Sequence, residues 1–256
     1  MKRSGLHAIA QWLQAQTPLV FFNNAAPILP ILRGEKALPK PTDLMPWLVE
    51  QCRPRGLRRL APGAHQRALR NLDGRSLLVG VEDQDVDLQL FHPGPWRRTN
   101  LLVVRDPANL FASRIRKART MPGHPAYPPR TGRWMDRVID AWKGHAREFV
   151  GRTDRLSDLV GIYFDLWFDS EAYRSALCQR LDIDCTDAGR DRVADYGGGS
   201  SFDGMDFDGA AAGMRVLDRV AMLDAAEREV LDAVMADPEI QELGEAIRES
   251  CSSLRP

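Results

Sequence analysis

The stretch NLLVVRDPANLFASR, residues 100–114, decides the fold class of this chain of 256 residues. Its first five residues form a short apolar run, which is typical of a strand buried on both faces of a parallel sheet. Pro107 then favours the first turn of a helix, because the N–H group that proline lacks would have no partner there. A buried strand that turns directly into a helix is the repeating unit of an α/β fold.

The same alternation of strand and helix recurs along the chain. Residues 76–81, SLLVGV, form a second apolar run, and residues 19–22 and 160–164 are weaker candidate strands. Helical patterns cover residues 5–14, 110–117, 134–150, 170–181 and most of 216–250. Strands that alternate with helices pair in parallel and are covered by helices on both faces. We therefore predict an α/β domain of three layers, α/β/α, around a central and mainly parallel sheet.

Length and composition are consistent with one compact domain over residues 1–256, since 44% of the residues are hydrophobic and can bury a substantial core. Three segments resist assignment to helices or strands, namely 27–75, 119–133 and 185–213. Long irregular segments in a compact domain often act as lids or binding loops, and we expect that role for these three.

Composition also indicates which partners and which cellular location to expect. The 35 basic and 35 acidic residues cancel, so no global field draws the chain to nucleic acid or to an acidic membrane surface. The four cysteines form no C-x-x-C pair and none lies at zinc-ligand spacing with a histidine, so we expect reduced, structural thiols and no metal site. No segment is apolar enough to be a secretory signal or to span a bilayer, which predicts a cytoplasmic protein.

One apolar stripe recurs at helical spacing within residues 134–150 and includes a histidine. A stripe of this kind usually packs into the core, so we expect its members to be buried rather than to contact a ligand. The residues are Trp134, Val138, Ala141, Trp142, His145 and Phe149.

Arg3, Ser4 and Gly5 lead directly into a helical pattern that begins with Leu6 and His7. The unpaired amides at a helix start, the helix dipole and an arginine side chain together bind anions such as phosphate or sulfate. A plain helix cap is the alternative interpretation. The full loop G-x-x-x-x-G-K-[ST] is missing from the sequence, which argues against ordinary hydrolysis of ATP or GTP.

Arg105 ends the apolar run of residues 100–104, and Ser113 lies on the helix that follows. Ligands bind at the carboxyl ends of strands in open α/β sheets, and the helix can bring the Ser113 hydroxyl towards the Arg105 guanidinium. Together these two side chains predict a compact site for a phosphate dianion. An Arg–Asp turn with a helix cap would explain the same residues.

These two motifs, in this order, resemble those of the sulfotransferase family. Residues 3–5 are similar to the family's 5′-phosphosulfate loop, Pro-[Lys/Arg]-Ser-Gly-Thr-Thr, and Arg105 with Ser113, eight residues later, matches the Arg and Ser that hold the 3′-phosphate. Residues 162–181 resemble the family's later strand and helix. The resemblance implies a P-loop-type fold and 3′-phosphoadenosine-5′-phosphosulfate as co-substrate, with no metal. The acceptor would be a hydroxyl or amine of a small molecule, glycan or lipid.

The chain departs from the family pattern at Lys2, which replaces the proline, and at Leu6 and His7, which replace the threonines. His7 could replace one hydroxyl donor, or the site could be degenerate. Family members also have a strand directly before the phosphate loop, whereas only two residues precede Arg3 here. We therefore expect Met1 to be an internal methionine of a longer natural protein, with the first strand missing from this chain.

The family's late Arg-Lys-Gly signature is also missing, and a glycine-rich segment, YGGGSSF at residues 196–202, takes its place. Gly198 and Gly199 permit positive φ angles and a close approach of the backbone to a ligand. Ser200 and Ser201 can donate to phosphate oxygens, and Phe202 offers an apolar surface to a base. A flexible turn is the alternative interpretation.

The resemblance also implies two catalytic roles. Arg3 would stabilise the negative charge that develops between the sulfuryl group and the departing phosphate. Glu82, preferred over Asp83, follows the run of residues 76–81 and would take the acceptor's proton as a general base. A solvated loop is the alternative for this acidic pair, and we expect Asp165 to be structural.

Two other functions stay open on the sequence alone. One is a small-molecule kinase of the P-loop type, because a cationic helix start also suits phosphoryl transfer. The other is a catalytically degenerate protein that binds a nucleotide or serves as a scaffold. The sequence identifies neither the acceptor nor the oligomeric state.

Overall fold

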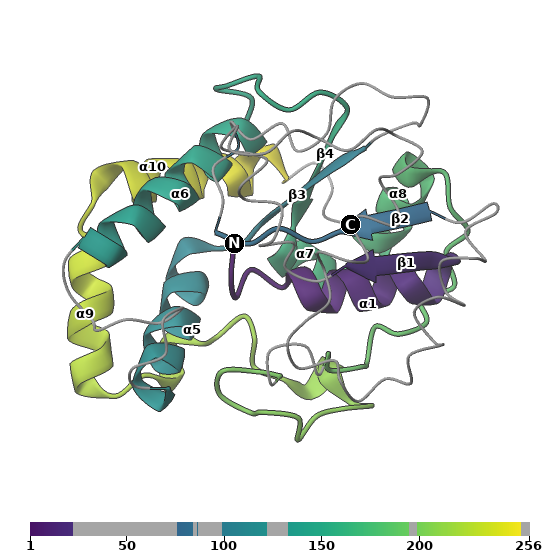
Figure 1. Cartoon of the computed structure of the whole chain (residues 1–256). Coiled ribbons are helices and arrows are strands. Elements are labelled where there is room, and N and C mark those ends of the chain that lie inside the picture. Colours follow the sequence, from purple (N-terminus) through teal and green to yellow (C-terminus); the bar gives the residue numbers. More distant parts are fainter. Residues whose placement is uncertain (23–75, 84–85, 87–98, 122–132, 195–198, 252–256) are drawn as a thin grey trace, which may run out of the picture.

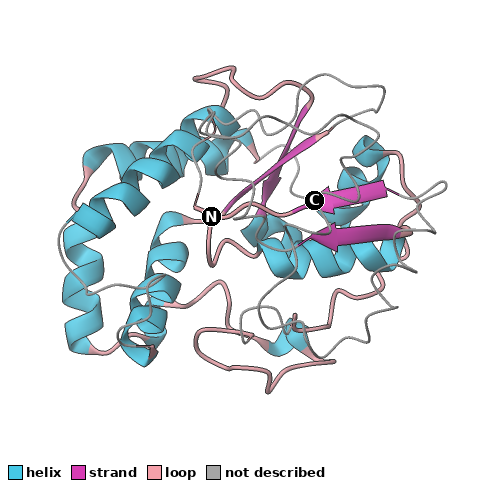
Figure 2. Cartoon of the chain, in the orientation of Figure 1, coloured by secondary structure: helices cyan, strands magenta, loops and turns pink. Residues whose placement is uncertain are grey.

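The computed structural model of the chain describes residues 1–22, 76–83, 86, 99–121, 133–194 and 199–251. These residues contain both α-helices and parallel strands (Figures 1 and 2), which confirms the mixed α/β class. The predicted loop 27–75 and most of the predicted loop 119–133 lie outside this part. The described residues of the third predicted loop, 185–213, form turns, one isolated bridge and a short 3-10 helix, Ala211–Gly213.

Four strands pair in parallel, as we predicted. Strand β1 (Leu19–Phe22) lies beside β2 (Ser76–Val79), and β3 (Asn100–Val104) lies beside β4 (Leu159–Tyr163). In the described part, the two pairs form separate two-stranded sheets, so the structure shows parallel pairing without joining all four strands into one central sheet.

The expected helices are present, and most of their ends differ by a few residues. The short helix Phe164–Asp169 was not predicted, and the region predicted from residue 216 becomes α-helical only at Ala225. Helix α5 begins with the proline that marks its first turn, and Asp237 divides the last helical region by capping a new helix that starts at Pro238. The α-helices of the described residues are α1 (Leu6–Gln16), α5 (Pro107–Thr120), α6 (Arg133–Phe149), α7 (Phe164–Asp169), α8 (Glu171–Leu181), α9 (Ala225–Met235) and α10 (Pro238–Ser250). None of the helices in these residues has the length and apolar character needed to cross a bilayer.

The apolar stripe of α6 packs into the core beside β3, as its spacing predicted. Val138, Trp142 and His145 are buried, and the Trp142 indole N–H donates to the Arg105 carbonyl at 3.3 Å. Ala141 and Phe149 are half-buried, and the side chain of Trp134 lies outside the described part. The bond from Trp142 fixes α6 against the turn that ends β3.

The turn between β3 and α5 is built by two aspartates. The Asp106 carboxylate caps α5 by accepting from the Asn109 amide at 3.0 Å. The Asp106 amide donates in turn to Asp165 of α7 at 2.8 Å, the structural role that we expected for Asp165. Burial raises the pKa of Asp165 to about 6, although the nearby charge of Arg105 and the Asp106 amide lower it. The start of α5 is therefore held against α7.

A buried ion pair joins the amino-terminal turn, the end of β2 and α5. The Arg114 guanidinium is fully buried and donates to the two Asp83 carboxylate oxygens at 2.8 and 3.1 Å. Lys2 completes the cluster, because its amide donates to Asp83 at 2.9 Å and its carbonyl accepts from Arg114 at 3.1 Å. Burial alone would raise the pKa of Asp83, but the charge and hydrogen bonds of Arg114 and the Lys2 amide lower it to about 2.

Replacing Asp83 by Asn should lower the free energy of unfolding at pH 7 by about 3 kcal/mol, because it removes the carboxylate charge that pairs with the buried Arg114 guanidinium. The folded-state pKa lies below the unfolded value of 3.8, so the stabilisation is present above pH 4 and disappears as the pH falls towards about 2. The difference between wild type and Asp83→Asn, measured by urea unfolding, should therefore shrink over that range. Asp218→Asn, which breaks an exposed pair with Arg215, is the control. A difference that stays constant with pH contradicts this account.

Candidate functional site

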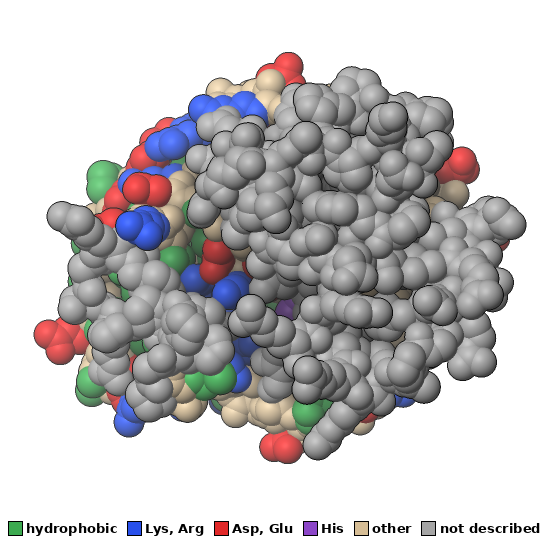
Figure 3. Space-filling model, in the orientation of Figure 1, with side chains coloured by type: hydrophobic (Ala, Val, Ile, Leu, Met, Phe, Trp, Pro, Cys, Tyr) green, Lys and Arg blue, Asp and Glu red, His purple; other side chains and the backbone are tan. Residues whose placement is uncertain are grey.

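A cavity of about 510 Å³ opens between the amino-terminal turn, α5, α7 and the segments around residues 190–194 and 199–219. That volume suits a drug-sized or nucleotide-sized ligand. Glu82 is the one carboxylate among its described lining residues, whereas several basic residues line it: Lys2, Arg3, Arg105, Lys117, Arg190, Arg192 and Arg219. Lys and Arg side chains also gather near the middle of the face shown in Figure 3. The charge of the described lining is therefore strongly positive.

Arg105 and Ser113 meet in the wall of this cavity, as their spacing predicted. Arg105 is buried, and its guanidinium donates to the Ser113 hydroxyl at 3.2 Å and to the Arg3 carbonyl at 3.0 Å. A third bond, of 2.5 Å, goes to the carbonyl of Val216. The Ser113 hydroxyl donates to the Asn109 carbonyl at 2.9 Å, which leaves its oxygen to accept from Arg105. The guanidinium thus has three neutral acceptors.

The charge of Arg105 is only partly compensated. Burial lowers its pKa to about 10; the carboxylate of Asp165 raises it, and the positive charges of Arg219 and Arg3 lower it further. In the described part of the chain no carboxylate is hydrogen-bonded to Arg105. An anion in the cavity would stabilise this buried cation, because a buried charge is costly unless an opposite charge lies near it.

The amino-terminus of α1 faces the same cavity. Gly5 is its N-cap residue, no side chain caps the helix, and the cavity lining includes Gly5, Leu6, His7 and Ala8. The first amides of a helix have no partner within the helix, and its dipole adds positive potential there. Only glycine fits at residue 5, because its φ is 94° and a Cβ atom would lie 2.0 Å from the Phe164 ring. The helix start therefore presents the positive end of its dipole to the cavity and packs against α7.

The Ser4 hydroxyl does not reach the cavity, where we predicted that it would contact the 5′-phosphosulfate. It is buried and donates to the Met1 carbonyl at 2.7 Å, and Ser4 is not part of the cavity lining. Arg3, in contrast, lines the cavity, and its guanidinium donates to the Gly199 carbonyl at 2.9 Å. Its backbone adopts the left-handed conformation, with φ of 68°. Ser4 thus shapes the turn, while Arg3 joins it to the glycine-rich segment.

Part of the glycine-rich segment lines the same cavity. Gly199, Ser200 and Ser201 line the cavity, while Gly198 lies outside the described residues. The Ser200 hydroxyl donates to Asp203 at 3.0 Å and accepts from Arg219 at 3.2 Å. Its predicted role as a phosphate donor therefore competes with its bonds to Asp203 and Arg219.

Phe202 does not line the cavity, although we expected it to offer a surface to a base. The guanidinium groups of Arg116 and Arg219 lie over its ring, 4.7 and 4.8 Å from the centroid. These cation–π contacts hold the segment to α5 and to residues 216–219. Other aromatic residues, Phe164, Trp167 and Phe168 of α7, line the cavity instead.

Glu82 and Asp83, the acidic pair after β2, have different surroundings. Glu82 lines the cavity, and its carboxylate lies 3.8 Å from the His7 imidazole Nε2. Asp83 is held by Arg114 and is not part of the lining. Of the two predicted carboxylates, only Glu82 is placed to meet a ligand in the cavity.

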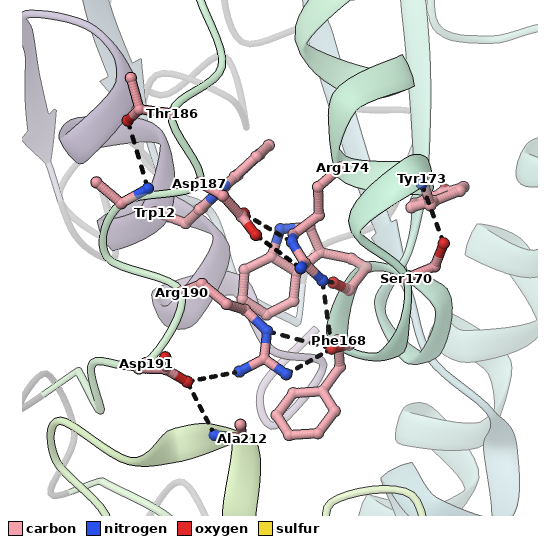
Figure 4. A network of polar contacts seen from close by, with 12 residues as sticks. Trp12, Phe168, Ser170, Tyr173, Arg174, Thr186, Asp187, Arg190, Asp191 and Ala212 are labelled. Atoms are coloured by element: carbon pink, nitrogen blue, oxygen red, sulfur yellow. Dashed lines mark hydrogen bonds and ion pairs between the residues drawn. The ribbon is translucent and has the colours of Figure 1, made fainter.

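Arg190, which the sequence did not single out, also reaches the cavity. Its guanidinium lies 4.1 Å from the centroid of the Phe168 ring and donates to the Phe168 carbonyl at 2.6 Å. Figure 4 shows the network behind it, in which Arg174 donates twice to Asp187 and the Trp12 indole donates to the same carboxylate. These bonds anchor residues 187–190 to α1, α7 and α8. Sequence reasoning missed Arg190 because it is far in sequence from the other lining residues. It could have predicted that Lys117 lines the cavity, because Lys117 lies one helical turn after Ser113 on α5.

Comparison of the chain with protein-family models, with curated proteins and with solved structures gives no significant match.

Gly5→Ala should lower the free energy of unfolding by more than about 2 kcal/mol, because the alanine would be forced into the left-handed region and against Phe164. Gly144→Ala is the matched control: a Cβ atom there meets nothing within 4 Å, and alanine should stabilise α6 by about 1 kcal/mol. Urea unfolding of both variants measures the contrast. Equal stabilities would show that α1 does not start against Phe164.

Proposed function

We propose that this chain is a sulfotransferase-like enzyme of the P-loop type that binds 3′-phosphoadenosine-5′-phosphosulfate in the basic cavity. The observation that carries the proposal is the buried Arg105 guanidinium, which is bonded to Ser113 and to two backbone carbonyls and lines the same cavity as the start of α1, where no side chain caps the helix. Two separate elements that suit anions thus share one cavity, as a nucleotide with phosphate groups at both its 3′ and 5′ positions requires. The three-layer arrangement around one sheet belongs to the same proposal.

The residues of the cavity fit the parts of this nucleotide. Arg105 and Ser113 would hold the 3′-phosphate, and the amides of Leu6 and His7 with Arg3 would hold the 5′-phosphosulfate. The aromatic residues Trp167 and Phe168 supply an apolar wall for the purine. Main-chain donors at α1 would do the work of the threonine hydroxyls that the family pattern has at residues 6 and 7.

The proposed reaction is an in-line transfer of the sulfuryl group. The acceptor oxygen or nitrogen bonds to sulfur, the bond from sulfur to the 5′-phosphate oxygen breaks, and adenosine 3′,5′-bisphosphate leaves with the electron pair. Arg3 and the α1 amides stabilise the charge that gathers on the departing phosphate. Glu82, which lies beside His7 in the cavity, takes the proton that the acceptor loses.

A second candidate is a protein that binds the nucleotide without turnover. It is favoured by the Ser200 hydroxyl, which is engaged with Asp203 and Arg219. Both candidates require the anion site, but only the enzyme requires Glu82.

Ser113→Ala should weaken binding of adenosine 3′,5′-bisphosphate about fivefold, and Arg105→Ala about tenfold to a hundredfold, because each loses a bond to a charged ligand. Isothermal titration calorimetry measures the affinities, and unfolding curves check that each variant is folded. Arg152→Ala, which removes an exposed cation paired with Glu242, is the control. Wild-type affinity in both site variants would refute the assigned 3′-phosphate site. Stabilisation by ATP equal to that by the bisphosphate would favour a kinase.

Glu82→Gln should lower kcat for sulfuryl transfer by about 10²- to 10⁴-fold, because a general base contributes an effect of that size. Arg3→Ala should abolish turnover. The assay supplies 3′-phosphoadenosine-5′-phosphosulfate with a panel of phenol, alcohol and amine acceptors, and the Glu82→Gln variant should still bind the bisphosphate. Binding by the wild type with no transfer to any acceptor class favours the second candidate.

A further inference from the structure

Lys117 is a cation of the cavity that neither the sequence motifs nor the proposed reaction uses. It lies on α5 four residues after Ser113, so the two side chains are one helical turn apart on the same face. Helical side chains lean towards the amino-terminus of their helix, which inclines the lysine towards Ser113. Lys117 and Ser113 both line the cavity.

The partners of the basic lining residues set Lys117 apart. Arg192 bonds to Asp208 at 2.8 Å, and Arg219 pairs with Asp203 at 2.8 Å. Among the described residues, the Lys117 ammonium has no carboxylate within ion-pair distance and no hydrogen-bond acceptor. An ammonium group that lines a cavity without such a partner is available to an anionic ligand.

The electrostatic surroundings of Lys117 agree with this. Burial lowers the pKa of Lys117, and the positive charge of Arg3 lowers it further. Two neighbouring cations that repel one another are both stabilised when an anion binds between them. The alternative is a cation that only complements the dipole at the carboxyl end of α5, and such a role would affect stability without affecting affinity.

We propose that Lys117 binds the same anionic group as Arg105 and Ser113, which makes the site selective for a ligand with a phosphate or sulfate dianion at that position. The inference rests on the anion site of the proposed function but not on sulfuryl transfer. With Lys117, the anion site extends along α5 by one turn. The preferred ligand then has two separate anionic groups, one bound at α5 and one at α1.

Calorimetric titration with adenosine 3′,5′-bisphosphate, adenosine 5′-monophosphate and inorganic pyrophosphate tests the assignment. Lys117→Ala should weaken bisphosphate binding about tenfold, in line with a lost charge-assisted bond. Its effect on the 5′-monophosphate, which lacks the second group, should be less than twofold, and Lys117→Arg should recover part of the affinity. Arg119→Ala is the matched control, because it removes the same charge from α5 at a residue paired with Asp224 and Glu227.

A double-mutant cycle with Ser113→Ala decides whether both residues bind one group. The combined variant should lose less affinity than the product of the two single effects, because the second change removes a contact that the first has already weakened. Independent effects, equal losses for both nucleotides, or wild-type affinity in Lys117→Ala would overturn the inference. So would a wild-type chain that binds neither the bisphosphate nor pyrophosphate. Failure of sulfuryl transfer with Lys117-dependent binding would overturn the proposed reaction alone.

Discussion

The Arg105 guanidinium is buried where β3 ends, and burying a positive charge is costly unless its N–H groups find acceptors and an opposite charge lies near. The chain meets the first requirement with Ser113 and the carbonyls of Arg3 and Val216. These acceptors come from parts of the sequence separated by more than a hundred residues. The amino-terminal turn, α5 and the segment before α9 are therefore positioned together by one side chain.

Arg114, the residue after Ser113 on α5, joins other parts of the chain through its ion pair with Asp83. It holds the end of β2 and the turn at Lys2 against α5. On α5, Ser113 thus lines the cavity while Arg114 forms a buried ion pair, because successive residues of a helix point in different directions. As a result, Glu82 lines the cavity, whereas its neighbour Asp83 is paired with Arg114.

The cavity that results has a fixed polarity. Basic side chains gather from the amino-terminal turn, α5 and the residues near 190 and 219, and the dipole of α1 adds to their potential. The surrounding bonds, such as those of Arg174 to Asp187 and of Arg219 to Asp203, hold these elements in place before any ligand arrives. Charges arranged in advance bind a developing anion without the cost of reorganisation, which is the property that transfer of a sulfuryl group needs.

The sequence by itself determined most of the elements, though not α7, and the spacing of Arg105 and Ser113, because apolar periodicity, a proline at a helix start and the pitch of a helix are local properties. Only the tertiary structure decided which neighbours meet. It directed the Ser4 hydroxyl to Met1, covered Phe202 with two guanidinium groups, placed Glu82 at the cavity but Asp83 in an ion pair, and brought Arg190 to the cavity. Such outcomes depend on contacts between residues far apart in the chain, where burial and charge pairing select one partner among many, and no local pattern records that choice.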